Sequence, residues 1–214
     1  RPCTCHLLHP LPRVRLESER FELAEGGFDA RAMRDGMIVG VCEGLDAEKG
    51  FSLEGRAAIW EDRTRIQTHH HPAIFGVYLE SAPGAGAAML ATTHAECLTG
   101  DLRYADGKIT EFAFYDDRQA GGDLRGGRGG PLRGTVRFDM QDKVPALGYA
   151  QSPDLRHGGE HSFRLLAQGL YFELYIDDFY VQTWRIPHPF TGRVGLCLAD
   201  CHAQVRGLVV RTGK

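Results

Sequence analysis

The residues best suited to chemistry in this sequence lie in one short stretch, LYFELYIDDFYVQTW at positions 170–184. Apolar and polar residues alternate along it, and Asp177 with Asp178 predicts a hairpin turn because aspartate tolerates the left-handed conformation. In an unbroken hairpin, one face carries the facing pairs Tyr175 and Tyr180, Glu173 and Gln182, and Tyr171 and Trp184. The other face carries Phe172, Leu174, Ile176, Phe179 and Val181, which predict the core. Rings that stack on the C–H faces of sugars, beside a carboxylate and an amide that bind hydroxyls, predict a carbohydrate-binding surface.

Neighbouring segments extend this aromatic and polar face. Alternation along residues 51–60, 73–81 and 134–141 points Leu53 and Ile59 inward and predicts as outward Glu54, Arg56, Trp60, Tyr78, Glu80, Arg137 and Asp139. Of these, Trp60, Tyr78, Glu80 and Arg137 join the candidate set. Together with the six hairpin residues they form the candidate sugar-binding set. A competing interpretation is that these rings cover a second layer of the fold or dock onto another domain.

The elements that must position these side chains are mostly strands. About a dozen short segments with alternating or apolar character are separated by Asp-Gly, Gly-Gly and Pro-Gly dipeptides, which mark turns. The segment 26–36 is the only one that predicts a helical turn. This pattern indicates an all-β fold, a two-sheet antiparallel β-sandwich of the jelly-roll type. We expect residues 1–12 to be a linker or lead-in arm and residues 13–214 to be a single sandwich domain.

Composition limits the partners. The 214 residues carry a formal charge of −3, with 25% charged and 43% hydrophobic residues. This charge gives no reason to expect nucleic acid or an anionic membrane as a partner. The longest apolar runs are too short to span a bilayer. The aromatic face makes an oligosaccharide or a neighbouring domain the expected partner.

Metal chemistry is poorly supported by the ligand spacing. His69 and His71 share a face of one segment, but no third ligand can be named for them. The pairs Cys3 and Cys5, and Cys197 and Cys201, do not have the C-x₂-C spacing of zinc sites. Two aspartate pairs could offer oxygens to calcium, namely Asp116 with Asp117 and Asp177 with Asp178, although such turns more often bind local backbone donors. We expect no metal site and no cofactor, and a structural calcium ion remains the weak alternative.

The last fifty residues resemble a known family. The run FRLLAQGLYFELYIDDFYVQTWRI, followed by TGRVG, is similar to the end of a concanavalin A-like β-sandwich. More narrowly, it resembles the C-terminal module that follows the propeller in family 32 glycoside hydrolases, the β-fructosidase-like enzymes. The matching positions are Arg164, Leu166, Glu173, Tyr175, Asp177, Asp178, Thr191, Gly192, Arg193 and Gly195. Ala167 departs from the pattern, which has a larger aliphatic residue there.

The resemblance implies an accessory role. The W-[MIL]-N-D-P and E-C-P motifs that carry catalysis in the family 32 propeller do not occur in this sequence. We therefore expect a non-catalytic, carbohydrate-associated module that braces a catalytic domain and contacts sugar through its aromatic face. One alternative is a self-contained glycan hydrolase or lyase with its site on a concave sheet face, formed by Glu173, Glu80, Tyr78 and Arg137. A further alternative is a protein-interaction module.

Overall fold

The computed structural model describes residues 6–7, 20–32, 37–61, 73–92, 97–105, 108–115, 155, 158–186, 188–199 and 201–213. All regular elements in these ranges are strands, arranged as two antiparallel sheets of seven strands each. Sheet A has the order β12 (Phe179–Arg185), β11 (Tyr171–Ile176), β10 (Glu160–Gln168), β5 (Phe51–Glu61), β14 (Cys201–Thr212), β3 (Gly27–Ala32) and β2 (Arg20–Ala24). Sheet B has the order β1 (His6–Leu7), β4 (Met37–Asp46), β13 (Thr191–Ala199), β6 (Ile74–Ala82), β7 (Ala85–Thr92), β8 (Cys97–Ala105) and β9 (Lys108–Tyr115). This confirms the predicted all-β, two-sheet sandwich.

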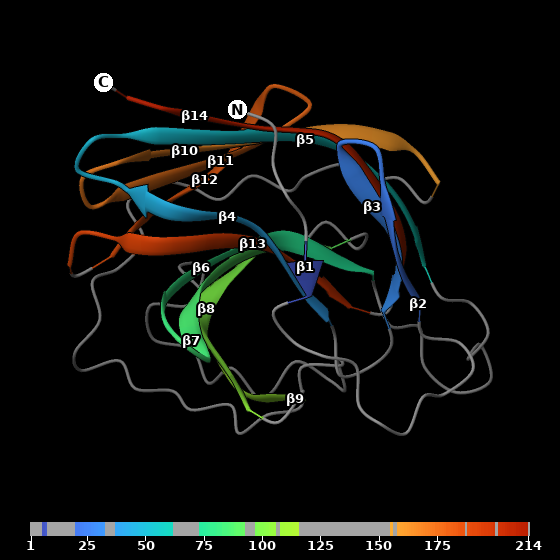
Figure 1. Cartoon of the computed structure of the whole chain (residues 1–214), viewed down its shortest axis with the longest axis horizontal. Coiled ribbons are helices and arrows are strands. Elements are labelled where there is room, and N and C mark those ends of the chain that lie inside the picture. The colour runs from blue at the N-terminus through green and yellow to red at the C-terminus, as the bar shows by residue number, and fades with distance from the viewer. Residues whose placement is uncertain are drawn as a thin grey trace.

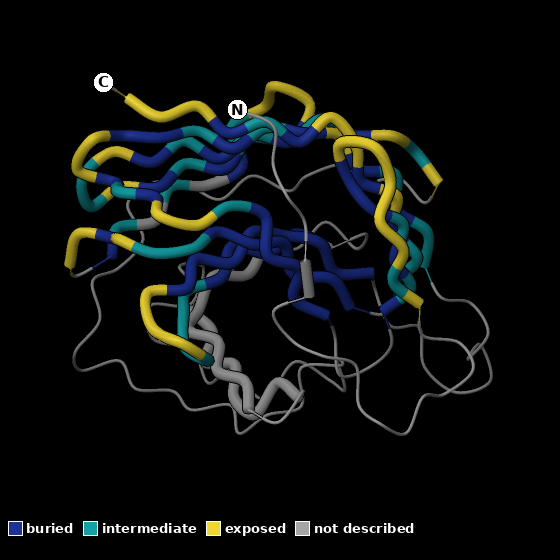
Figure 2. Tube along the Cα trace, in the orientation of Figure 1, coloured by how far each residue is buried: buried dark blue, intermediate teal, exposed yellow. Residues whose placement is uncertain are grey.

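Sheet A arches over sheet B, so its outer face is convex along the strands (Figure 1). The core between the sheets follows directly from the alternation in the sequence. Along β5, for example, Phe51, Leu53, Ala57 and Ile59 are buried, whereas Ser52, Glu54 and Arg56 lie on the outer face. Strands β10 and β11 alternate in the same way, as the colours of Figure 2 show. The outer face of sheet A is therefore the surface on which the predicted polar side chains gather.

The hairpin of β11 and β12 is confirmed, but part of its predicted register is wrong. Asp177 and Asp178 have φ values of 51° and 61°, the left-handed conformation that two-residue hairpin turns favour. Tyr175 pairs with Tyr180 as predicted. A bulge after Leu174 then shifts the pairing by one residue, so that Thr183 lies across from Glu173. The same bulge pairs the backbone of Gln182 with Leu174, that of Trp184 with Phe172, and that of Arg185 with Tyr171.

Other predictions of local structure are wrong at identifiable places. Residues 27–32 form strand β3 between β2 and β14, not a helical turn. Strand β8 was not predicted. Phe179 was assigned to the core, yet it is 72% exposed beside the hairpin turn.

The proposed arm at residues 1–12 contributes His6–Leu7 to sheet B as β1, paired with β4. The domain boundary after residue 12 lies outside the described residues and stays a prediction. Within the described ranges, no helix is long and apolar enough to cross a membrane.

Candidate functional site

The candidate site begins with a row of three side chains on neighbouring strands of sheet A. Arg164 of β10 pairs in register with Tyr175 of β11 on one side and with Glu54 of β5 on the other. Since paired residues share a face, an aromatic ring, a guanidinium group and a carboxylate lie side by side on the outer surface. This row combines a flat apolar face with charged hydrogen-bonding groups.

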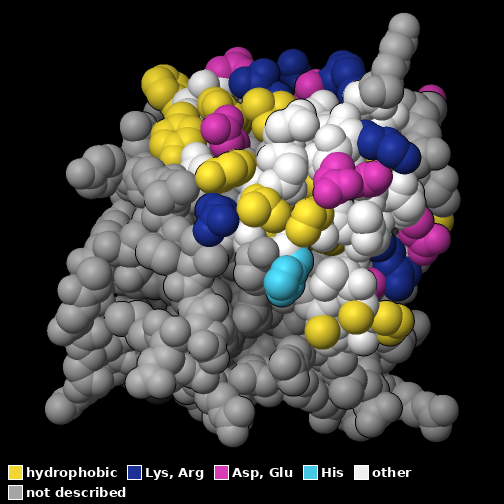
Figure 3. Space-filling view, turned by 90° about the vertical axis from the view of Figure 1, so that its left-hand side faces the viewer, with side chains coloured by type: hydrophobic (Ala, Val, Ile, Leu, Met, Phe, Trp, Pro, Cys, Tyr) yellow, Lys and Arg dark blue, Asp and Glu magenta, His cyan; other side chains and the backbone are white. Residues whose placement is uncertain are grey.

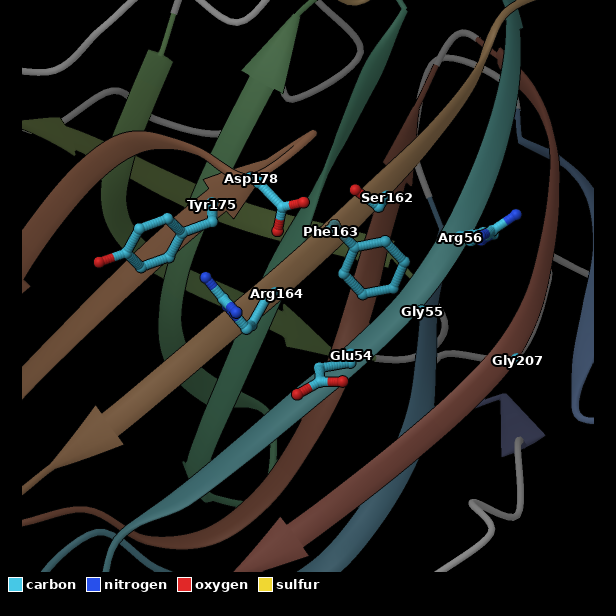
Figure 4. Close-up of a pocket in the computed structure, with 9 residues that line it drawn as sticks. All are labelled: Glu54, Gly55, Arg56, Ser162, Phe163, Arg164, Tyr175, Asp178 and Gly207. Atoms are coloured by element: carbon cyan, nitrogen blue, oxygen red, sulfur yellow. The ribbon is translucent and has the colours of Figure 1, made fainter.

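A hollow of about 250 Å³ opens at this row. Its lining residues come from β5, β10, β11, the hairpin turn and β14, and are Glu54, Gly55, Arg56, Ser162, Phe163, Arg164, Tyr175, Asp178 and Gly207. The guanidinium carbon of Arg164 lies 4.8 Å from the centre of the Tyr175 ring, a cation–π contact. Figure 4 shows the Arg164 head between the Tyr175 ring and the Glu54 carboxylate, with the Asp178 carboxylate and the Ser162 hydroxyl at the upper rim.

Arg164 has no ion-pair partner among the described residues. Its Nε is buried and has no hydrogen-bond partner among the described residues. Two neighbouring arginines, in contrast, form ion pairs: Arg56 with Glu160 at 3.2 Å and Arg211 with Glu54 at 2.5 Å. Arginine carries five N–H donors, so Arg164 can donate to a ligand without first breaking an ion pair of this face.

The Tyr175 ring is held by neighbours on its own hairpin. Its hydroxyl donates to Oε2 of Glu173 at 2.9 Å, and this hydrogen bond, with burial, raises the pKa of Tyr175 above its ordinary value. The Tyr180 ring meets it edge to face, with ring centres 5.9 Å apart. The Tyr180 hydroxyl in turn donates to Oγ1 of Thr183 at 2.7 Å. Tyr175 is therefore a neutral ring in a fixed orientation, which suits stacking.

A second hollow of about 480 Å³ follows along the same strands. It is lined by Lys49, Gly50, Phe51, Ser52, Leu166, Ala167, Gln168, Tyr171, Glu173, Arg211, Thr212 and Gly213. Its lining residues Lys49, Gly50 and Gln168 lie beside the turns after β4 and β10, which meet at one end of the sandwich (Figure 1). Seen from that end, charged side chains of both signs gather along the upper edge, where the outer face of sheet A begins (Figure 3).

In the opposite half of the outer face, the polar side chains form hydrogen bonds with one another. Asp29 of β3 accepts from Arg20 at 2.6 Å and from Gln204 at 2.8 Å, and His202 lies 3.1 Å away. Burial raises the pKa of Asp29, but these hydrogen bonds outweigh it and hold the pKa below its ordinary value. Trp60, a predicted sugar contact, stacks on the His202 ring with centres 4.8 Å apart. Trp60 thus lies on the predicted sheet face, but away from both hollows.

Tyr78 and Glu80 do not lie on this surface, and the prediction that they face outward is wrong. Tyr78 is fully buried and Glu80 is 3% exposed. Strand β6 is buried on both faces from Ile74 to Glu80, visible as a continuous buried run in Figure 2. Because Tyr78 and Glu80 belong to sheet B and Glu173 to the outer face of sheet A, the constellation of the enzyme interpretation is not assembled.

Glu80 has a structural partner in the TGRVG segment. Its Oε2 accepts from Nε of Arg193 at 2.7 Å, and its Oε1 accepts from the backbone N–H of Gly84 at 2.9 Å. A Cβ on Gly192 would lie 2.1 Å from the carbonyl oxygen of Glu80, so only glycine fits there. The segment that resembles family 32 modules therefore braces β13 against β6.

Of the remaining predicted positions, some lie outside the described residues and others lack a described side chain. Arg137, His69, His71, Cys3, Cys5, Asp116 and Asp117 belong to this group. The side chains of Gln182 and Trp184 are likewise not described, so their assignment to a sugar contact stays a prediction.

The described residues contain no group of three His, Cys, Asp or Glu side chains placed to hold a metal ion. Cys197 and Cys201 are fully buried, and burial raises the pKa of the Cys197 thiol to about 12. The Asp177 carboxylate already lies 2.6 Å from Nδ1 of His161 and accepts from the N–H of Ser162 at 2.8 Å. The Asp177 side chain therefore binds the hairpin turn to β10, not to the turn's own backbone donors.

Several residues of the hollows were not among the sequence candidates. Arg164, Glu54, Ser52, Leu166, Gln168 and Arg211 all line them. The alternation in HSFRLLAQG could have placed Arg164, Leu166 and Gln168 on one face, because they are two residues apart. Their meeting with Arg211 depends on β5 lying between β10 and β14, which no local pattern reveals.

No protein-family model and no curated protein matches this sequence. Among solved structures, the fold is similar to the carbohydrate-binding module CBM66 from Bacillus subtilis, with 13% identity and a TM-score of 0.54, covering 97% of this chain and 94% of that chain. The galectin LEC-6 from Caenorhabditis elegans has 6% identity and a TM-score of 0.44, covering 92% of this chain and 99% of that chain. An alginate lyase from Corynebacterium sp. has 9% identity and a TM-score of 0.45, covering 90% of this chain and 81% of that chain. The likeness to CBM66 shows the fold, a concanavalin A-like β-sandwich.

Proposed function

We propose that this chain is a non-catalytic carbohydrate-binding module whose sugar site lies on the outer face of sheet A. The observation that carries the proposal is the row of Tyr175, Arg164 and Glu54 at the hollow of about 250 Å³. A sugar ring presents C–H groups on its face and hydroxyls around its edge. The Tyr175 ring offers area for the face, while Arg164 and Glu54 offer donors and acceptors for the hydroxyls.

The likeness in fold to a solved carbohydrate-binding module supports the same class of function. The resemblance of the C-terminal segment to family 32 modules supports the finer proposal that the chain braces the catalytic domain of a glycoside hydrolase. In that case fructo-oligosaccharides are the first ligands to test.

The experiment is titration calorimetry of the 214-residue chain with fructo-, gluco-, galacto-, manno- and uronate oligosaccharides. We expect at least one class to bind, and Tyr175→Ala to weaken that binding by tenfold or more, about 1.4 kcal/mol. The matched control is Trp60→Ala, which removes a ring from the same sheet face outside both hollows and should leave the Kd unchanged. Thermal melts establish that each variant is folded.

If no glycan binds the parent chain, the outer face is a docking surface for a protein domain, and the carbohydrate proposal fails. If Trp60→Ala abolishes binding while Tyr175→Ala does not, sugar binds at the Trp60 end of the sheet, and the proposed site at Tyr175 is wrong.

A further inference from the structure

The two hollows lie one after the other along strand β10, and we treat them together as one groove. Four outward residues of β10, namely Ser162, Arg164, Leu166 and Gln168, line it in succession. The first two belong to the smaller hollow and the last two to the larger one. At about 3.3 Å per residue, the floor from Ser162 to Gln168 extends for roughly 20 Å.

Both walls of the groove are continuous from one hollow to the next. On the β11 side, the hydroxyl of Tyr175 in the first hollow donates to Glu173 in the second, at 2.9 Å. On the opposite side, Glu54 of the first hollow pairs with Arg211 of the second, at 2.5 Å. These contacts run along the walls and leave the β10 residues between them as the floor.

The second hollow repeats the chemistry of the first. Tyr171 is 44% exposed and offers a ring, while Leu166 offers a partly buried apolar floor. In register, Leu166 lies between Ser52 and Glu173, which present a hydroxyl and a carboxylate. An apolar surface flanked by hydrogen-bonding groups is again suited to a sugar ring.

From this continuity we infer that the ligand is a linear oligosaccharide lying along β10, with consecutive sugar units in the two hollows. This inference rests on the proposed carbohydrate-binding function and specifies its ligand class as an extended chain. One unit stacks at Tyr175 and Arg164, and the next lies over Leu166 against Tyr171. A single sugar fills only part of the groove.

The test is a chain-length series. Kd values are measured by titration calorimetry for oligomers of one to six units of the glycan class that binds the parent. We expect affinity to rise at least tenfold between one unit and four. Tyr175→Ala should weaken binding at every length, whereas Tyr171→Ala should remove most of the gain with length and leave the Kd of the shortest ligand unchanged. The control Phe179→Ala removes a ring that is 72% exposed and does not line either hollow, and it should leave the whole series unchanged.

The outcomes separate this inference from the function on which it rests. A parent chain that binds no glycan of any length overturns the carbohydrate proposal itself. Equal affinity for all lengths leaves that proposal intact and overturns the extended-chain inference. An equal loss at every length in Tyr171→Ala, the shortest ligand included, also overturns it, because Tyr171 then belongs to the first subsite. Tyr171 is 44% exposed and lies outside the core, so thermal melts of the variant should match those of the parent within 2 °C or so.

Discussion

Replacing Arg193 by methionine tests whether the TGRVG segment serves the fold. Arg193 donates from Nε to the carboxylate of Glu80 at 2.7 Å, where the Glu80 side chain is 2% exposed and the Arg193 side chain 28% exposed. Removing the arginine leaves a buried carboxylate without the cation that offsets its desolvation. Breaking a fully buried pair costs about 3–5 kcal/mol, and an exposed pair is worth about 0–1 kcal/mol.

Because Arg193 is partly exposed, we expect a loss of about 2–4 kcal/mol in the free energy of unfolding. For a domain of this size, 1 kcal/mol lowers Tm by roughly 2–4 °C, so a fall of roughly 4–16 °C follows. The assay is urea denaturation of the parent, Arg193→Met, Glu80→Gln and the double variant, from which the coupling energy of the pair is obtained.

The matched control is the same cycle on Arg211 and Glu54, a pair whose side chains are 60% and 36% exposed. Its coupling energy should stay within about 1 kcal/mol. If the Arg193 cycle gives a coupling no larger than this control, the reasoning that the segment braces sheet B through a buried ion pair is refuted.

Three further predictions concern the fold and its response to pH. Gly192→Ala should lower Tm in thermal melts by more than 5 °C or so, because its Cβ would lie 2.1 Å from the carbonyl oxygen of Glu80; an unchanged Tm would contradict that close approach. Leu174→Ala should cost about 2–5 kcal/mol in urea denaturation, since Leu174 is 1% exposed, and a cost below 1 kcal/mol or so would remove it from the core. Burial raises the pKa of Asp177, but hydrogen bonds from His161 and Ser162 outweigh it and leave the pKa below its ordinary value. Between those two pKa values the unfolded chain binds more protons, so this stability is present above the ordinary aspartate pKa and is lost as pH falls below it. Asp177→Asn should therefore lose less Tm than the parent between pH 6 and pH 3; an equal loss would show that Asp177 contributes nothing to acid sensitivity.

Alternation in the sequence predicted which residues share a face of a strand, and it did so well where one face is solvent-exposed. Strand β5 is the clearest case, with Leu53 and Ile59 inside and Glu54 and Arg56 outside as expected. The same rule placed Tyr78 outside, wrongly. Alternation shows which residues share a face of a strand, but not whether that face is covered by other parts of the protein. Strand β6 is buried on both of its faces.

The site was harder to predict because it depends on contacts between distant segments. The bulge after Leu174 inserts one residue into the hairpin, and a two-residue period contains no sign of it. The groove needs β5 between β10 and β14, and Glu54 pairs with Arg164, 110 positions further along the chain. Local patterns therefore predicted the ring of Tyr175 and the outward side of Glu54, and missed that Glu54 lies beside Arg164 and pairs with Arg211.

The positions on which the sequence analysis based the resemblance to family 32 modules divide into two groups in this structure. Arg164, Leu166, Glu173 and Tyr175 line the groove on the outer face of sheet A. The glycines and the arginine of TGRVG lie in β13 of sheet B, where they permit close packing and hold Glu80. Gly192 and Arg193 are half-buried like the first group, but their contacts lie within the protein, whereas the first group lines the hollows.

The distribution of internal bonds over the outer face explains why the groove, and not the rest of that face, is available for a ligand. On the β3 side, Arg20, His202 and Gln204 converge on Asp29, so a ligand there must compete with bonds that already exist. Binding that exchanges one set of hydrogen bonds for another has little net gain. In the hollows, Glu54 and Glu173 also have partners, but Arg164 forms no ion pair with a described residue, so its free donors can bind a ligand without breaking an ion pair. The same sheet face thus separates into a half that stabilises the fold and a half whose chemistry is left for recognition.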